Sequence, residues 1–299
     1  MKKLRLRYLV GVVILAVVVI IIVVTSLSSS TTKKTAPVSV KPLSIVAGPA
    51  GIVSGATPDS SNDSWVLVNL GNRANLQDIN VTTGKVAGVD PITNQAHVVT
   101  VAPGGQIGLG LGVGVSGAVE FFSPQGFNLQ GEVPLSGPVT DLVAGSDGTT
   151  YYALQDVKGA FSATVIDAKT MKVTGTVPLP SQTLSIAVSP DLTTIYSLQS
   201  NGDITLADIQ TGKPTQKIPF TAGARQLVLS QDGSTLYVLK GSFQDDNVSE
   251  IDIATEATVR VLPAPKNTQW ITPSSDGTEL YDFVGTATTG NIQSFATHR

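Results

Sequence analysis

The side chains that could do acid–base or metal chemistry are few in this sequence. Its two histidines are His97 and His298, and it contains no cysteine. A Ser-His-Asp arrangement would have to use His97, and no nucleophile-elbow motif accompanies it. The counts exclude metal sites that need several histidine or cysteine ligands. The sequence therefore predicts no catalytic residue, no metal site and no cofactor, with a lactonase- or hydrolase-like enzyme as the alternative.

A second set of side chains suits ligand binding better than catalysis. These residues stand six or seven positions before a repeated turn, or in a loop nearby: His97, Asp141, Arg225, Gln226, Trp270 and Asp245, with Lys240 and Phe243 close in sequence. An arginine, an aspartate and a tryptophan that meet in a concave opening would suit a small polar ligand, a sugar or a peptide. In the alternative interpretation, Arg225 and Asp141 pair across neighbouring repeats and Trp270 packs.

The element that must position these residues is a repeated hairpin. The stretch Gln226–Leu239, QLVLSQDGSTLYVL, is typical of a strand, a tight Asp-Gly turn and a second strand. Its turn aspartate recurs at intervals of 41 or 44 residues, as Asp147, Asp191, Asp232 and Asp276. Degenerate copies centred on Gly104 and Asp59 bring the number of copies to six. This period is the one expected of four-stranded β-propeller blades.

Each copy continues into two further predicted strands, and the body shows no sustained 3.6-residue apolar period. We therefore expect an all-β, six-bladed β-propeller of four-stranded antiparallel blades over residues 38–299, because a closed ring protects the sheet edges. The last copy ends one strand short at Asn291–Arg299. A spare strand-like run, Val38–Val46, precedes the first copy. The sequence predicts that residues 38–47 supply the outer strand of the last blade.

These repeats resemble a known family. The motifs S-P-D-x-x-x-x-Y, from Ser189, and VIDAKTMKVTGTVP, from Val165, are similar to the YVTN-type β-propeller repeat of bacterial extracytoplasmic proteins. The likeness is strongest from Asp141 to Pro265 and covers most of residues 50–299. It implies a surface-exposed propeller and brings no catalytic residues. Seven blades are common in that family, whereas the length of this chain favours six.

One predicted strand is unusually rich in glycine. Gly108, Gly110, Gly112 and Gly114 alternate with leucine and valine, so one face of the strand is bare. Because glycine weakens a strand, something must approach that face closely. The pattern favours a bulky neighbour, such as an aromatic side chain of the adjacent blade, over a ligand. The match to a dinucleotide fingerprint has no helix after it and is rejected.

The N-terminus has the pattern of a membrane anchor. Residues 1–7 carry four positive charges and form a basic cytoplasmic tail, and residues 8–27 include a long uncharged apolar run. About 20 such residues span a bilayer as a helix, and the flanking charges favour a cytoplasmic N-terminus. Residues 28–37 read as a flexible linker. The sequence thus predicts one transmembrane signal-anchor helix in the cell membrane and an extracytoplasmic propeller, with a cleaved signal peptide as the alternative.

Charge narrows the possible partners. All 22 acidic residues lie beyond residue 27, together with 15 of the 19 basic residues. A mildly acidic body argues against nucleic acid. We expect a monomeric body that binds an envelope protein or glycan, with the membrane contacted through the N-terminal helix.

Overall fold

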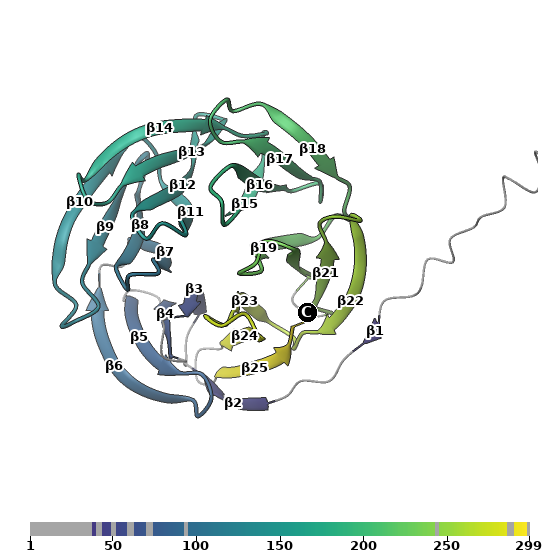
Figure 1. The fold of residues 1–299 in the computed structure, drawn as a ribbon. Helices are drawn as coiled ribbons and strands as arrows, with labels where there is room; N and C mark the ends of the chain where they lie inside the picture. The colour runs from purple at the N-terminus through teal and green to yellow at the C-terminus, as the bar shows by residue number, and fades with distance from the viewer. Residues whose placement is uncertain are drawn as a thin grey trace, which may run out of the picture. The chain divides into compact units, whose positions relative to one another are not determined.

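A computed structural model describes residues 38–39, 44–48, 52–58, 63–69, 74–92, 95–242, 245–285 and 290–297. This part of the chain contains 25 strands in six sheets and no helix. The sheets follow one another around a ring, which Figure 1 shows end-on. The predicted all-β, six-bladed propeller with four-stranded antiparallel blades is confirmed.

No helix of the described residues is long and apolar enough to cross a membrane. The predicted tail (1–7), transmembrane helix (8–27) and linker (28–37) all lie outside the described residues.

The blades are numbered in chain order, and each runs from an innermost to an outermost strand. Blade 1 contains β3 (Ile52–Pro58), β4 (Asp63–Asn69), β5 (Ala74–Asn80) and β6 (Lys85–Ile92). Blade 2 contains β7 (Ala96–Val101), β8 (Ile107–Val113), β9 (Ser116–Phe122) and β10 (Leu129–Leu135). Blade 3 contains β11 (Val139–Ala144), β12 (Thr150–Val157), β13 (Ala160–Asp167) and β14 (Lys172–Pro178).

The other three blades follow the same plan. Blade 4 contains β15 (Thr183–Val188), β16 (Thr194–Gln199), β17 (Ile204–Asp208) and β18 (Pro214–Ile218). Blade 5 contains β19 (Ala224–Leu229), β20 (Thr235–Lys240), β21 (Asn247–Asp252) and β22 (Ala257–Pro263). Blade 6 contains β23 (Thr268–Pro273), β24 (Glu279–Gly285) and β25 (Gly290–Ala296).

The two remaining strands come from the N-terminal side of the ring. Strand β2 (Ser44–Gly48) pairs antiparallel with β25 and is the outer strand of blade 6, where Figure 1 shows it at the periphery. Strand β1 (Val38–Ser39) pairs parallel with β22, at the outer edge of blade 5. The segment predicted to complete the last blade, residues 38–47, is thus divided between two blades.

The turn between the two innermost strands of a blade is fixed by its aspartate. In blade 3, Asp147 Oδ1 accepts hydrogen bonds of 2.9 Å from the backbone N–H groups of Thr149 and Thr150. The preceding strand is joined to the next through Gly148, which has a φ of 70°. A side-chain carboxylate that satisfies backbone donors and a glycine with positive φ are what a tight hairpin turn requires. These hydrogen bonds hold the pKa of Asp147 below its usual value, although partial burial acts in the opposite direction.

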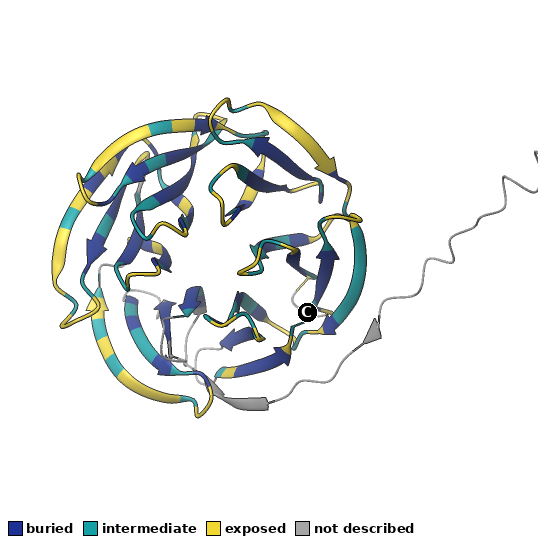
Figure 2. Ribbon diagram, in the orientation of Figure 1, coloured by how far each residue is buried: buried dark blue, intermediate teal, exposed yellow. Residues whose placement is uncertain are grey.

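Burial falls from the inner to the outer strands. Strand β16 is buried over most of its length, whereas the outer strands β6 and β18 are largely exposed (Figure 2). The core therefore lies between blades, where one sheet face packs on the next. Apolar clusters fill these interfaces around the ring.

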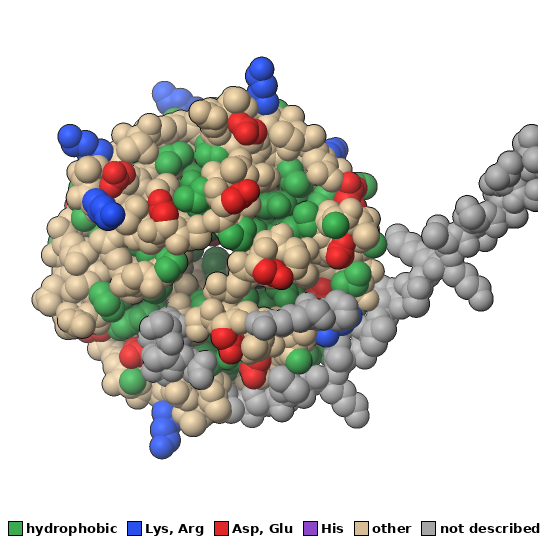
Figure 3. Space-filling model, in the orientation of Figure 1, with side chains coloured by type: hydrophobic (Ala, Val, Ile, Leu, Met, Phe, Trp, Pro, Cys, Tyr) green, Lys and Arg blue, Asp and Glu red, His purple; other side chains and the backbone are tan. Residues whose placement is uncertain are grey.

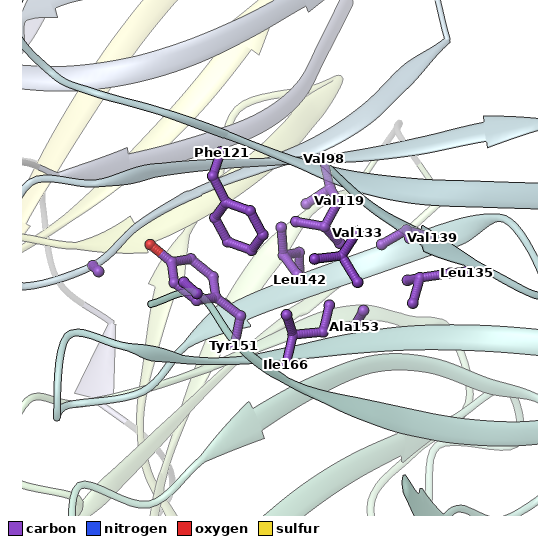
Figure 4. Packing of buried hydrophobic residues seen from close by; sticks show 12 residues of the cluster. Val98, Val119, Phe121, Val133, Leu135, Val139, Leu142, Tyr151, Ala153 and Ile166 are labelled. Atoms are coloured by element: carbon purple, nitrogen blue, oxygen red, sulfur yellow. The ribbon is translucent and has the colours of Figure 1, made fainter. Parts of the chain in front are cut away.

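The glycine face of strand β8 allows residues of the next blade to pack closely against it. A Cβ on Gly108 would lie 2.9 Å from Tyr151 Cε1, and one on Gly110 would lie 2.6 Å from Val139 Cγ1. Both neighbours belong to blade 3. Figure 4 shows Tyr151 facing Phe121 in this interface, and their ring centroids lie 4.9 Å apart at an interplanar angle of 77°. The predicted bulky aromatic neighbour from the adjacent blade is confirmed.

Candidate functional site

Every innermost strand begins with a β-bulge. In all six blades the register of the innermost strand shifts by one residue near its start, which leaves one residue without a cross-strand partner. The six residues are Ser54, His97, Thr140, Leu184, Arg225 and Gln269. We call them the bulge ring. A bulge re-aims a side chain, and here the same device recurs six times around one end of the channel axis.

The residue after each bulge turns toward the next blade. Asp141 accepts hydrogen bonds from Ser185 Oγ (2.8 Å) and from the backbone N–H of Ile186 (2.9 Å), both in blade 4. Gln226 Oε1 accepts from the N–H of Ile271 (2.9 Å), and its Nε2 donates to the carbonyl of the same residue (3.0 Å). These side chains are buried, with 6% and 5% exposure respectively. Their polar atoms join blade 3 to blade 4 and blade 5 to blade 6.

Trp270 has the same role at the point where the ring closes. Its Nε1 donates to the carbonyl of Ala56 in blade 1 at 3.0 Å, and its ring packs against the apolar cluster between blades 6 and 1. In blade 1 the corresponding residue is Gly55, where a Cβ would lie 2.8 Å from the backbone nitrogen of Val99 in blade 2. The position therefore links blades through a hydrogen bond or through close packing.

Burial changes the acidity of Asp141. Removal from water raises the pKa of its carboxyl to about 6, against three hydrogen bonds that lower it, from Ile186, Ser185 and Leu142. The predicted alternative in which Asp141 pairs with Arg225 is wrong, because each has other partners.

Two residues of the bulge ring are committed to neighbouring blades. Arg225 Nη2 lies 2.8 Å from Asp246 Oδ1, and Nη1 donates to the carbonyl of Thr268 in blade 6 at 3.0 Å. Gln269 accepts from the N–H of Val53 in blade 1 at 2.6 Å and donates to the carbonyl of Gly285. In blades 5 and 6, the side chains of the bulge ring are therefore engaged in contacts that join neighbouring blades.

Three residues of the bulge ring remain exposed. His97, Thr140 and Leu184 lie on blades 2, 3 and 4, and we call them the open arc. His97 Nε2 lies 3.4 Å from the carbonyl oxygen of Gly112, and Leu184 is 41% exposed. The turn between β8 and β9 at the same end carries Val115, which is 88% exposed. The open arc thus offers an imidazole, a hydroxyl and an apolar side chain with little formal charge.

The predicted site residues therefore separate into two groups. His97 and Arg225 belong to the bulge ring, whereas Asp141, Gln226 and Trp270 are engaged between blades. Asp245 is exposed. Its neighbour Asp246, buried at 7% exposure, is the residue that pairs with Arg225.

Sequence reasoning missed Asp246, Thr140 and Leu184. Thr140 and Leu184 stand seven positions before the turn aspartates Asp147 and Asp191, but a threonine and a leucine did not suggest a binding site. Their common place before the turn was the usable signal.

Among the residues that the structure describes, no group of three or more His, Cys, Asp or Glu side chains could hold a metal ion.

Figure 3 shows one face of the propeller, hollowed at the centre of the ring. On this face most lysine and arginine side chains lie at the outer rim, and acidic side chains are spread from the rim to the edge of the hollow.

No family model matches the sequence, and no curated protein matches it. The resemblance to YVTN-type repeats therefore has no family match behind it. Among solved structures, the chain is similar to a chain of Kuenenia stuttgartiensis hydrazine synthase, with 18% identity and a TM-score of 0.59. The match covers 85% of this chain and 76% of that chain. A likeness at this identity shows the fold, a β-propeller, and a fold by itself does not specify a function.

Proposed function

We propose that this protein is an interaction module that binds an envelope protein or glycan through the open arc of its propeller. The observation that carries the proposal is the division of the bulge ring. Arg225 and Gln269 hold neighbouring blades together, whereas His97, Thr140 and Leu184 are exposed. Side chains re-aimed by a bulge and free of inter-blade bonds are suited to bind a ligand.

The chemistry of the open arc indicates the kind of ligand. Its three side chains can donate or accept hydrogen bonds or cover an apolar patch, and none carries a fixed charge. Sugars and neutral peptide segments are recognised through this combination of polar and apolar contacts. An uncharged envelope glycan or a loop of an envelope protein therefore suits the arc better than a nucleic acid does.

The location of the protein is a further part of the proposal. Residues 8–27 form a single transmembrane signal-anchor helix with the N-terminus in the cytoplasm, and the propeller lies outside the membrane. The uncharged apolar run and the four basic residues before it support this arrangement. The likeness to YVTN-type repeats of bacterial extracytoplasmic proteins supports it independently. Protease added to intact cells should remove a C-terminal tag and leave an N-terminal tag intact; the reverse pattern would exclude this topology.

The binding role is tested by affinity capture with the full-length, tagged chain in solubilised envelopes. Leu184→Asp should lower the amount of a specific partner recovered at least tenfold, because it places a charge in an uncharged arc. The matched control is Leu129→Asp on β10, where the leucine is 58% exposed at the outer rim. The control should recover the partner as the wild type does. Equal losses in both variants, or no specific partner in repeated captures, would count against the proposal.

The hydrolase alternative is not favoured by the geometry. The imidazole of His97 contacts a backbone carbonyl, that of Gly112, and a general base needs a nucleophile within hydrogen-bond reach. A panel of lactones and esters should show no turnover by the full-length protein.

A further inference from the structure

The interface between blades 5 and 6 buries an unusual number of charged groups. Arg225 pairs with Asp246 at 2.8 Å, and Arg260 Nε lies 2.7 Å from Glu250 Oε2. Both carboxylate side chains are fully buried. Arg260 also donates to the carbonyl of Ala296 in blade 6, so this second pair bridges the two blades. Each of these arginines therefore neutralises one carboxylate.

A third carboxyl in the same interface has no such partner. Asp282 lies on β24 of blade 6, opposite Ile271 of β23 and Gln293 of β25, and its exposure is 0%. Ile271 and Leu280 on the same face pack against blade 5, so Asp282 points into the interface with blade 5. Neither of its carboxyl oxygens has a hydrogen-bond partner among the described residues.

Neither protonation state of Asp282 finds a hydrogen-bond partner among the residues that the structure describes. A carboxylate without donors costs several kcal/mol to bury. A proton would remove the charge, but its O–H would then lack an acceptor. Native structures rarely leave buried polar atoms in this state, and a bound water molecule or ion is one explanation.

The same ring shows how this chain treats another buried carboxyl. Asp141, at 6% exposure, has a donor for each oxygen: Leu142 N–H for Oδ1, and Ser185 Oγ and Ile186 N–H for Oδ2. In blade 5 the residue that corresponds to Asp141 is Gln226. Its side-chain amide forms hydrogen bonds with the backbone N–H and the carbonyl of Ile271. Those groups are therefore not available to Asp282.

The charges of the interface decide the class of guest. Arg225 and Arg260 face three carboxyl groups, those of Asp246, Glu250 and Asp282, so one negative charge is left over when all three are ionised. Asp246 Oδ2 accepts from the N–H of Thr268 on β23, the strand that pairs with β24. Burial raises the pKa of Asp282, and the charge of Asp246 raises it further. Oxygen ligands and one excess negative charge suit a hard monovalent cation.

We propose that Asp282 and Asp246 hold a monovalent cation of the sodium type between blades 5 and 6. Carboxylate oxygens are the ligands that β24 and the loop before β21 supply, and Gln226 Oε1, which accepts from the N–H of Ile271 opposite Asp282, is a further oxygen. The cation would neutralise the interface and join the two blades to which β1 and β2 attach. This site is separate from the open arc and does not depend on the proposed binding role.

The test measures the stability of the full-length chain in a non-ionic detergent at fixed ionic strength. At pH 8, the urea midpoint should be higher in sodium chloride than in choline chloride. At pH 5 the difference should shrink, because protons compete for Asp282. Two other titratable groups lie in this interface. Tyr237 stays neutral over this range because burial raises its pKa, whereas Glu250, whose pKa burial raises to about 7, gains a proton between pH 8 and pH 5 in either salt. Equal midpoints in the two salts at pH 8 would show that a proton or a water molecule occupies the site and would overturn the proposal.

Two variants locate the effect. Asp282→Asn preserves the shape of the side chain and should abolish the difference between sodium and choline at pH 8. Asp141→Asn, at the satisfied carboxyl between blades 3 and 4, should retain it. Sodium dependence that survives Asp282→Asn would place the cation elsewhere, and stabilisation by calcium but not by sodium would overturn the monovalent assignment.

Discussion

Blades 2 and 3 meet through glycines and aromatic rings, whereas blades 5 and 6 meet through buried charges. In the first interface, β8 presents a bare face on which Tyr151 and Val139 rest. In the second, two arginines and three carboxyl groups lie between sheets whose three inner strands are arranged in the same way. Both interfaces keep the bulge at the start of the innermost strand.

The difference between the two interfaces indicates which features every blade must share and which can vary from one interface to the next. The hairpin turn and the bulge set the shape of a blade, and they recur around the ring. The contact between blades needs only to be filled and satisfied, by close packing in one place and by ion pairs in another. The two kinds of interface should respond differently to substitution, salt and pH.

Breaking an ion pair between blades 5 and 6 should have the largest effect. Arg225→Met removes the partner of Asp246, whose side chain is fully buried, and leaves a carboxylate without its cation. Loss of one partner of a buried pair costs about 3–5 kcal/mol, which urea denaturation would measure as a lower midpoint. Lys217→Met is the control, because Lys217 pairs with Asp203 at the surface with 58% of its side chain exposed. The control should change stability by less than about 1 kcal/mol. Similar losses in both variants would show that the blade 5–6 pair is no different from a surface pair.

Adding one methyl group to β8 should have the next largest effect. In Gly110→Ala the new Cβ would lie 2.6 Å from Val139 Cγ1 and 2.7 Å from Val98 Cγ1, so blades 2 and 3 must separate or repack. Overpacking of this kind costs about 1–3 kcal/mol. Gly104→Ala is a matched control, because a Cβ there meets nothing within 4 Å. The loss in Gly110→Ala should be the same in low and high salt, and a strong salt dependence would contradict a steric origin.

The pH dependence of stability should come from the charged interface. Burial raises the pKa of Glu250 to about 7, although Arg260 opposes the shift, so the folded state binds its proton more tightly than the unfolded state does. The stability that Glu250 contributes is complete below its unfolded pKa of about 4.5 and is lost as the pH rises through about 7. From pH 5 to pH 8 the wild type should lose stability on the order of 1 kcal/mol from this group. Glu250→Gln should flatten the profile and Gly110→Ala should leave its slope unchanged; the opposite pattern would assign the titration to Asp282 or Asp141, whose pKa values burial also raises.

The sequence predicted the ring well and its site in part, for physical reasons. Turn chemistry and a two-residue apolar period are local, so the hairpins, six blades and the crowded glycine face of β8 followed from the residues alone. The direction of a side chain after a bulge depends on the register of the neighbouring strand. Asp141 and Gln226 therefore seemed suited to line the mouth, although they turn into the next blade.

Charge partners were harder to predict than strands. Asp245 and Asp246 are adjacent and identical in type, and only the loop geometry selects Asp246 for Arg225. Asp282 carried a usable signal, because it follows a tyrosine at a strand position where the other copies have Ala153, Ser197 and Val238. An acid at a place otherwise held by small or apolar residues marks a buried charge.

The smallest effect that still separates the two interfaces comes from removing one hydroxyl. Tyr151 is fully buried, and its hydroxyl donates to the carbonyl of Gln106 in blade 2 at 2.9 Å. Tyr151→Phe keeps the ring against Phe121 and loses this single hydrogen bond, at a cost of about 0.5–1 kcal/mol. If packing holds blades 2 and 3 together, this loss should be well below that of Gly110→Ala and insensitive to salt. A loss as large as that of Arg225→Met would mean that a polar contact, and not the glycine face, holds blades 2 and 3 together.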